Sequence, residues 1–176
     1  MSLDIKYAPY TENELGHELI QSFVLSDDEL IEATFELNEE CGEDVELTIS
    51  FAGQSHTSQA PSFFEALTGI RELLEKDNRY PICFGTCENV YPSGMSLSMG
   101  TGRLAYRCTL GSPARNEDIV DIFNADETCI PVTIETQKLF NRAWVESIGK
   151  RTAQQSEGAP VKKKSFSGKL GKLFGK

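Results

Sequence analysis

The sequence predicts an α+β fold, a mainly antiparallel sheet of about four to six strands with a capped central helix and a C-terminal helix packed on it. Two neighbouring stretches that alternate between apolar and polar residues predict the sheet, and a following stretch with apolar residues at helical spacing predicts the central helix. The length of 176 residues suits a single domain. We place this domain at residues 1–151 and a flexible basic tail at residues 152–176.

The clearest strands are predicted at residues 30–37 and 45–51, where apolar and polar side chains alternate. Such a pattern indicates an antiparallel hairpin with one face buried and the other exposed. Four carboxylates make its tip acidic: Glu39, Glu40, Glu43 and Asp44. The preceding residues 11–24 fit either a helix or, in their second half, a strand, and the sequence leaves both open.

The central helix is predicted to begin after Ser62, because Glu65 follows three residues later and completes a capping box. Apolar residues then recur along one face: Phe63, Leu67, Ile70 and Leu74. We expect this face to lie across the apolar side of the hairpin.

Three shorter elements and a final helix complete the predicted domain. Short strands are predicted at residues 80–84 and 103–110. The apolar side of the second strand is formed by Leu104, Tyr106, Cys108 and Leu110. Residues 116–123 predict a capped helical turn, and the apolar spacing of residues 134–151 predicts the C-terminal helix.

The stretch at residues 85–102 has no periodicity and is rich in glycine and serine. Long loops inside compact domains are often functional. Together with the next residue, it holds side chains typical of adaptable contact surfaces: Asn89, Tyr91, Met95, Met99 and Arg103. These side chains fit a contact surface and packing against the end of the sheet equally well, and Tyr91 and Arg103 are the candidate anchors.

The cysteines and histidines form no recognisable site. The five cysteines are Cys41, Cys83, Cys87, Cys108 and Cys129. Their odd number and scatter indicate the reduced thiols of a cytosolic protein, and the second close pair of a structural zinc site is missing. Nucleophilic catalysis would need a histidine base, and neither His17 nor His56 lies in a catalytic motif. We therefore predict no metal, no cofactor and no enzymatic activity.

Charge is divided unevenly along the chain, whose formal net charge is −10. Residues 1–46 carry fourteen acidic residues and one lysine, a net charge of −13, whereas residues 150–176 carry eight basic residues and one glutamate, a net charge of +7. An acidic surface speeds association with a positively charged protein and can imitate the phosphates that a nuclease binds. We expect a basic protein partner, and no nucleic acid for the body of the molecule.

The tail has a basic amphipathic pattern. Its lysines and apolar residues are Lys162, Lys163, Lys164, Phe166, Leu170, Leu173 and Phe174. An induced helix would place the four apolar side chains on one face, as in helices that lie on membranes, although three glycines oppose such a helix. The tail therefore predicts weak contact with anionic membranes. Because no apolar run could span a bilayer and no secretory signal is recognisable, we expect a cytoplasmic protein.

About a third of the chain, residues 63–123, resembles a known group of proteins. The segments that carry the resemblance are Asn89-Val-Tyr-Pro-Ser-Gly-Met95, Met99-Gly-Thr-Gly-Arg-Leu-Ala-Tyr106 and Asp118-Ile-Val-Asp-Ile-Phe123. They are similar to small uncharacterised bacterial proteins that are associated with the immunity proteins of polymorphic toxin systems. The resemblance implies a bacterial cytosolic α+β binding protein and transfers no functional residue.

These observations predict a non-catalytic immunity protein that neutralises a basic toxin of nuclease type by covering its active face. The tip carboxylates would make the contact, with Tyr91 and Arg103 as anchors. Two alternatives stay open: a peripheral membrane adaptor that uses the tail, and a small enzyme with its site in the loop at residues 85–103.

Overall fold

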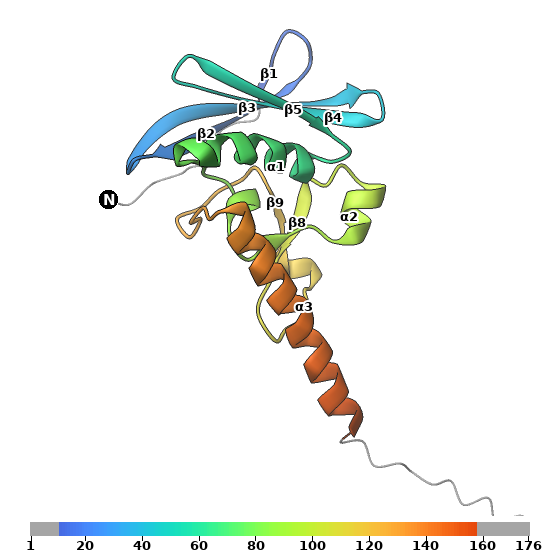
Figure 1. Cartoon of the computed structure of the whole chain (residues 1–176). Helices are drawn as coiled ribbons and strands as arrows, with labels where there is room; N and C mark the ends of the chain where they lie inside the picture. Colours follow the sequence, from blue (N-terminus) through green and yellow to red (C-terminus); the bar gives the residue numbers. More distant parts are fainter. Residues whose placement is uncertain (1–10, 158–176) are drawn as a thin grey trace, which may run out of the picture.

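The computed structural model describes residues 11–157, which form a mixed α+β structure with two antiparallel sheets (Figure 1). Its α-helices are α1 (Phe63–Leu74), α2 (Gly94–Met99) and α3 (Ile134–Glu157). In Figure 1 the large sheet forms the upper layer, α1 lies beneath it, and the small sheet, α2 and the start of α3 lie below α1. The predicted fold class is confirmed.

The large sheet has six strands. They are β1 (Thr11–Glu12), β2 (Glu18–Ser26), β3 (Glu29–Cys41), β4 (Asp44–Phe51), β5 (Gln54–Ala60) and β6 (Arg79–Pro81). The first five lie side by side in chain order, and β6 pairs with the far end of β2. The predicted hairpin corresponds to β3 and β4. The undecided residues 11–24 contain β1, a turn and the first seven residues of β2, which pairs with β3 along its whole length.

Strand β5 has no counterpart in the predicted elements. Its side chains are mostly polar, so it lacks the apolar alternation that marks β3 and β4. A two-residue turn joins it to β4, and both turn residues, Ala52 and Gly53, have positive φ angles of 47° and 72°. Such turns suit the twist of a hairpin, and a glycine there is the local signal for one.

Helix α1 packs on the sheet as predicted. The Ser62 hydroxyl accepts a hydrogen bond from the backbone N–H of Glu65 at 3.3 Å and donates one to the Glu65 carboxylate at 2.8 Å, so this pair does cap the helix. The four predicted apolar residues of α1 are buried, together with Phe35 and Leu47 of the sheet. Phe123 adds a further layer, with its ring 5.2 Å from that of Phe35.

The small sheet consists of β7 (Val90–Tyr91), β8 (Leu104–Arg107) and β9 (Ile119–Asp121), and three short 3-10 turns connect the elements. These turns are Glu75–Asp77, Phe84–Thr86 and Asn116–Asp118. The helical turn predicted at 116–123 is wrong beyond the third of these turns, since residues 119–121 pair with β8. The stretch at 85–102 is also more regular than expected, because it contains β7 and α2.

The predicted orientation of β8 is wrong. Leu104, expected on the buried side, is 52% exposed, whereas Ala105 is 1% exposed. Ala105 lies opposite Val120 in the strand pairing, and its small side chain belongs to the buried core. The larger apolar side chains of β8 therefore face outward.

A buried polar cluster holds α1, the first residues after β6 and α3 together. Arg71 of α1 is 1% exposed and donates hydrogen bonds to the Gly85 carbonyl (3.3 Å), the Val132 carbonyl (2.8 Å) and Gln137 Oε1 (2.6 Å). It also pairs with Glu75 at 3.5 Å. We call Arg71, Glu75 and Gln137 the polar joint.

Gln137 completes the polar joint from α3. Its side-chain amide lies within hydrogen-bond distance of the carbonyls of Gly85, Cys87 and Val90, at 2.9–3.0 Å. Further along α3, Trp144 donates a hydrogen bond to the Ser112 carbonyl. The helix then continues to Glu157, six residues past the predicted end at Arg151, and so crosses the expected boundary between domain and tail.

Candidate functional site

The four carboxylates predicted at the hairpin tip do lie together. Glu39 and Glu40 lie just before the end of β3 at Cys41, a turn through Gly42 reverses the chain, and Glu43 precedes Asp44, the first residue of β4. Gly42 has a φ of 78°, in the left-handed region that glycine adopts without strain. All four carboxylate side chains are exposed. We call these four residues the acidic tip.

The turn between β1 and β2 lies beside the acidic tip. Residues 15–18 and 37–40 line a common hollow of about 320 Å³. At this end of the sheet, the Glu36 carboxylate accepts a hydrogen bond from the Asn13 amide at 2.8 Å and lies 2.7 Å from His17 Nδ1. Glu36 is thus bound by two side chains of the protein, although 35% of its own side chain is exposed, whereas all four residues of the tip are on the surface.

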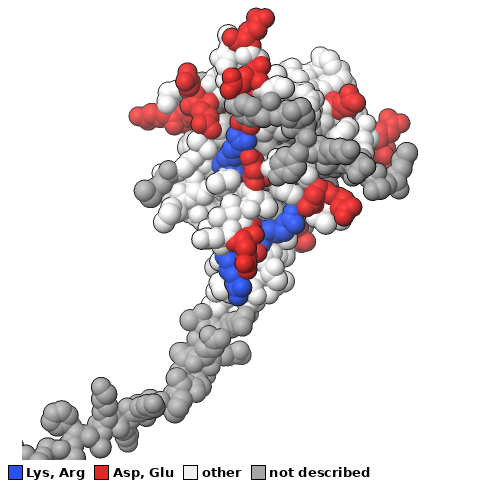
Figure 2. All heavy atoms as spheres, turned by 180° about the vertical axis from the view of Figure 1, so that it is seen from behind, with Lys and Arg blue, Asp and Glu red and all other residues white. Residues whose placement is uncertain are grey.

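The acidic first quarter of the sequence does not form one continuous surface. Asp27, Asp28 and Glu29 occupy the turn between β2 and β3, at the opposite end of the sheet. Nine residues of β3 lie between Glu29 and Glu39, so the two ends are roughly 33 Å apart. Figure 2 shows carboxylates on several separate projections around the upper part of the molecule. The acidic tip is therefore one of two acidic ends, a division that the charge count along the chain does not reveal.

Arg103, a predicted anchor, is bound to carboxylates of the protein itself. Its guanidinium contacts both oxygens of Glu18, one of them at 2.8 Å, and Nε donates to Asp121 at 2.7 Å. These two acceptors raise the pKa of Arg103. The side chain therefore links β2 of the large sheet to β9 of the small sheet, and we do not retain it as a contact residue.

Tyr91, the other predicted anchor, is half-buried. Its ring lies edge-on to that of Phe64 at 5.1 Å, and it lines a hollow between α1, β5 and α3. Packing thus accounts for one side of this ring. The side chain of Met95, on α2, is not packed in this way, because it is 72% exposed.

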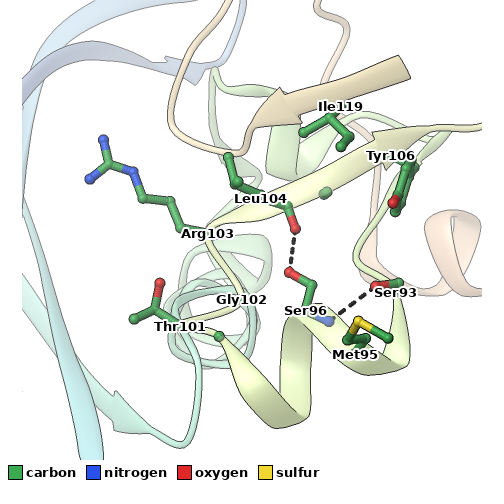
Figure 3. A pocket seen from close by; sticks show the side chains of 11 residues that line it. Ser93, Met95, Ser96, Thr101, Gly102, Arg103, Leu104, Tyr106 and Ile119 are labelled. Atoms are coloured by element: carbon green, nitrogen blue, oxygen red, sulfur yellow. Dashed lines mark hydrogen bonds between the residues drawn. The ribbon is translucent and has the colours of Figure 1, made fainter. Parts of the chain in front are cut away.

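An open groove of about 650 Å³ lies between α2 and the outer face of the small sheet (Figure 3). Its apolar lining comes from Met95, Leu104, Tyr106 and Ile119. The outward orientation of β8 creates this lining, since Leu104 and Tyr106 would be buried if the strand faced the other way. In Figure 3 the Arg103 side chain points away from these residues.

Most polar side chains of the groove form hydrogen bonds within its own walls. Ser93 caps α2 by accepting a hydrogen bond from the Ser96 N–H at 3.0 Å, and the Ser96 hydroxyl donates to the Leu104 carbonyl at 2.6 Å. Arg103 is the single charged residue of the lining within residues 11–157, and it is paired elsewhere. The groove therefore offers apolar contact area rather than groups placed for proton transfer.

The groove and the acidic tip are connected through β4, β5 and the start of α1. Val45, which follows the tip, pairs with Ala60, and Ala60 leads to Ser62 at the start of α1. Ser62 in turn lies against Gly102 in the groove wall, so closely that a side chain at Gly102 would meet it at 2.6 Å. In Figure 1 the β3–β4 turn and α2 lie on the same side of the molecule.

Four of the predicted site residues, those of the acidic tip, are brought together. The loop predicted as a contact surface supplies part of the groove, including Met95 and Arg103, whereas Leu104, Tyr106 and Ile119 were not predicted as site residues. A signal for these three existed in the apolar residues of β8 and β9, but alternation alone does not say which face of a strand is buried. The predicted membrane contacts, Lys162, Lys163, Lys164, Phe166, Leu170, Leu173 and Phe174, lie outside the described residues.

Comparisons with known proteins do not assign the chain to a family. No protein-family model matches it, and no curated protein matches it either. Within the described residues, no group of three or more histidine, cysteine or acidic side chains is placed to hold a metal ion. None of the helices in this range is both long and apolar enough to cross a membrane.

Proposed function

We propose that this chain is a non-catalytic binding protein, an immunity protein that neutralises a basic toxin of nuclease type in the bacterial cytoplasm. The acidic tip would occupy the basic face on which the toxin binds nucleic acid, and the groove would receive an apolar side chain of the toxin. The observation that carries the proposal is an exposed cluster of four carboxylates on the same side of the molecule as an open apolar groove.

This combination suits a protein interface. Central apolar contacts supply most of the binding energy at interfaces, and charged residues around them set the association rate and exclude wrong partners. An exposed apolar patch also costs solubility, which makes it informative in a surface that is otherwise charged. Met95, Leu104 and Ile119 supply such a patch, with exposed fractions of 39–72%.

The first test reverses the acidic tip, with the opposite end of the sheet as a matched control. The tip variant changes Glu39, Glu40, Glu43 and Asp44 to lysine, and the control variant changes Asp27, Asp28 and Glu29 to lysine. Each tagged full-length chain is used to capture basic proteins from its host, and each captured protein is purified and tested for nuclease activity. We expect the tip variant alone to lose the partner.

Binding kinetics with the purified partner then distinguish long-range electrostatic attraction, which acts on the association rate, from direct contacts, which act on the dissociation rate. At 50 mM salt, the tip variant should associate at least about tenfold more slowly than the wild type, with a weaker dependence on salt, because rim charges act mainly on the association rate. The wild type and the control variant should suppress the nuclease activity. An unchanged association rate of the tip variant at low salt would contradict the proposal.

The groove is tested with two exposed side chains. Leu104→Ser and Ile119→Ser remove apolar area without disturbing the core, so we expect faster dissociation of the same partner at an unchanged association rate. Leu110→Ser is the matched control, because Leu110 is exposed to a similar degree but does not line the groove. Equal dissociation rates for all three variants would remove the groove from the interface.

A further inference from the structure

Two cysteines that are far apart in the sequence meet near the base of α3. The sulfur atoms of Cys87 and Cys129 lie 3.1 Å apart, although 42 positions separate the residues. Both are free thiols in the structure. Cys87 is buried and Cys129 is half-buried, so the pair lies at the boundary between core and surface.

The backbone holds the two thiols in this position. Cys87 forms an isolated antiparallel bridge with Pro131, two residues after Cys129. The Val132 N–H donates to the Thr86 carbonyl at 2.9 Å, and the Gln137 amide donates to the Cys87 carbonyl at 3.0 Å. A disulfide needs a sulfur–sulfur distance of about 2.05 Å, so the sulfurs must approach by roughly 1 Å, a shift that side-chain rotation can supply.

The chemical surroundings distinguish this pair from the other described thiols. Burial raises the pKa of Cys83 to about 12 and that of Cys108 to about 11, which keeps both protonated and unreactive. The pKa of Cys87 is lowered, first by its hydrogen bond with Cys129 and then by the Ile130 N–H and the positive charge of Arg107. Cys87 is therefore the sulfur that ionises first, while the same contact raises the pKa of Cys129.

We propose that Cys87 and Cys129 form a redox-active dithiol that closes to a disulfide when a small hydroperoxide oxidises it. This site is independent of the acidic tip and the groove, and it does not rest on the proposed function. Closure would tie the segment after β6 to the segment that leads into α3.

The chemistry proceeds in two balanced steps with hydrogen peroxide as oxidant. The Cys87 thiolate attacks one peroxide oxygen, an S–O bond forms and the O–O bond breaks, and the departing hydroxide takes up a proton to become water. The Cys129 sulfur then attacks the Cys87 sulfur, an S–S bond forms, the S–O bond breaks, and the proton of Cys129 leaves with the hydroxyl as a second water. The two thiols lose two electrons, and the peroxide gains them.

The test maps the thiols of the full-length wild-type chain before and after hydrogen peroxide. Dilute protein is oxidised, its remaining thiols are alkylated, and it is digested with trypsin and chymotrypsin for mass spectrometry. Cleavage after Phe84 separates Cys83 from Cys87, so the linked sulfurs are identified without a substitution. We expect a Cys87–Cys129 peptide that dithiothreitol removes, while Cys83 and Cys108 stay available for alkylation after unfolding.

A second measurement identifies the attacking sulfur. In Cys129→Ser the peroxide should leave a sulfenic acid at Cys87, which dimedone traps, whereas Cys87→Ser should yield less than about a tenth of that adduct at Cys129. Circular dichroism confirms that both variants are folded. A peroxide-treated wild-type chain with no Cys87–Cys129 link, or with Cys83 linked instead, would overturn the proposal.

Discussion

The polar joint and the acidic tip both consist of charged and polar side chains, but they differ in what surrounds them. In the polar joint, Arg71 is buried and each of the three nitrogens of its guanidinium contacts an acceptor of the protein. At the acidic tip, the carboxylates project into solvent. Water solvates the tip well, so its charges are available to a partner and contribute little to stability, whereas the charge of the joint is part of the fold.

Replacement of Arg71 should produce the largest loss of stability. Arg71→Leu leaves the partly buried Glu75 without its cation and removes donors from two backbone carbonyls and from the buried Gln137. We expect a loss of about 3–5 kcal/mol in the free energy of unfolding, measured with urea. Arg71→Lys keeps the charge but lacks the planar guanidinium, so its free energy of unfolding should lie between those of the wild type and Arg71→Leu. If Arg71→Leu were as stable as the wild type, the joint would not hold the fold.

Alkaline pH should weaken the protein through Cys83, which lies beside the polar joint. Its pKa is raised to about 12 by burial, so between pH 9 and 12 the unfolded chain loses this proton while the folded chain keeps it. The stabilising contribution of the protonated thiol is complete below pH 9 and is lost as the pH rises toward 12, by about 1.4 kcal/mol per unit. Urea unfolding at pH 8, 9.5 and 10.5 measures the slope, and Cys83→Ala should flatten it. Parallel curves for the two proteins would exclude this origin.

Arg103 should have an intermediate effect, because it is half-buried. Arg103→Leu removes the cation that joins Glu18 and Asp121 across the two sheets, and we expect a loss of about 1–2 kcal/mol after allowance for solvent screening. Arg115→Leu is the matched control, since the Arg115–Glu117 pair is exposed and should contribute nothing measurable. Thermal unfolding of both variants makes the comparison, and equal melting temperatures would show that the inter-sheet link is dispensable.

The acidic tip should affect stability least. Replacement of Glu39, Glu40, Glu43 and Asp44 by glutamine is expected to change the free energy of unfolding by less than about 0.5 kcal/mol in either direction, because exposed charges are well solvated. The same variant should slow association with the basic partner. A large stability change would mean that these carboxylates serve the fold, and the contrast with the polar joint would disappear.

Local patterns were sufficient for the parts of the molecule with one buried face. The alternation in β3 and β4, the cap at Ser62 and the apolar face of α1 each depend on neighbouring residues, and all three are found in the structure. The acidic tip followed as well, because a turn between two paired strands must lie at their common end. Strand β5 was missed because its polar side chains carry no apolar period.

Other features depended on contacts between distant residues. Arg71 and Gln137 are 66 positions apart in the sequence, and Cys87 and Cys129 are 42 positions apart. No local sequence pattern predicts that either pair is in contact. Arg103 looked like a surface anchor until its two carboxylates were located on β2 and β9. The secondary-structure propensity of a charged residue is the same whether its side chain lies in water or beside an acceptor. Tertiary packing therefore decides its role.

The sequence by itself determined the α+β class, the hairpin with its acidic tip and the amphipathic α1, since each follows from periodicity and local hydrogen bonding. Only the tertiary structure decided which face of β8 is buried, which acids share an end of the sheet, and which polar groups and thiols meet inside. Those outcomes depend on how the two sheets and α3 fill the same core, where space and hydrogen-bond partners are shared among residues that are remote along the chain.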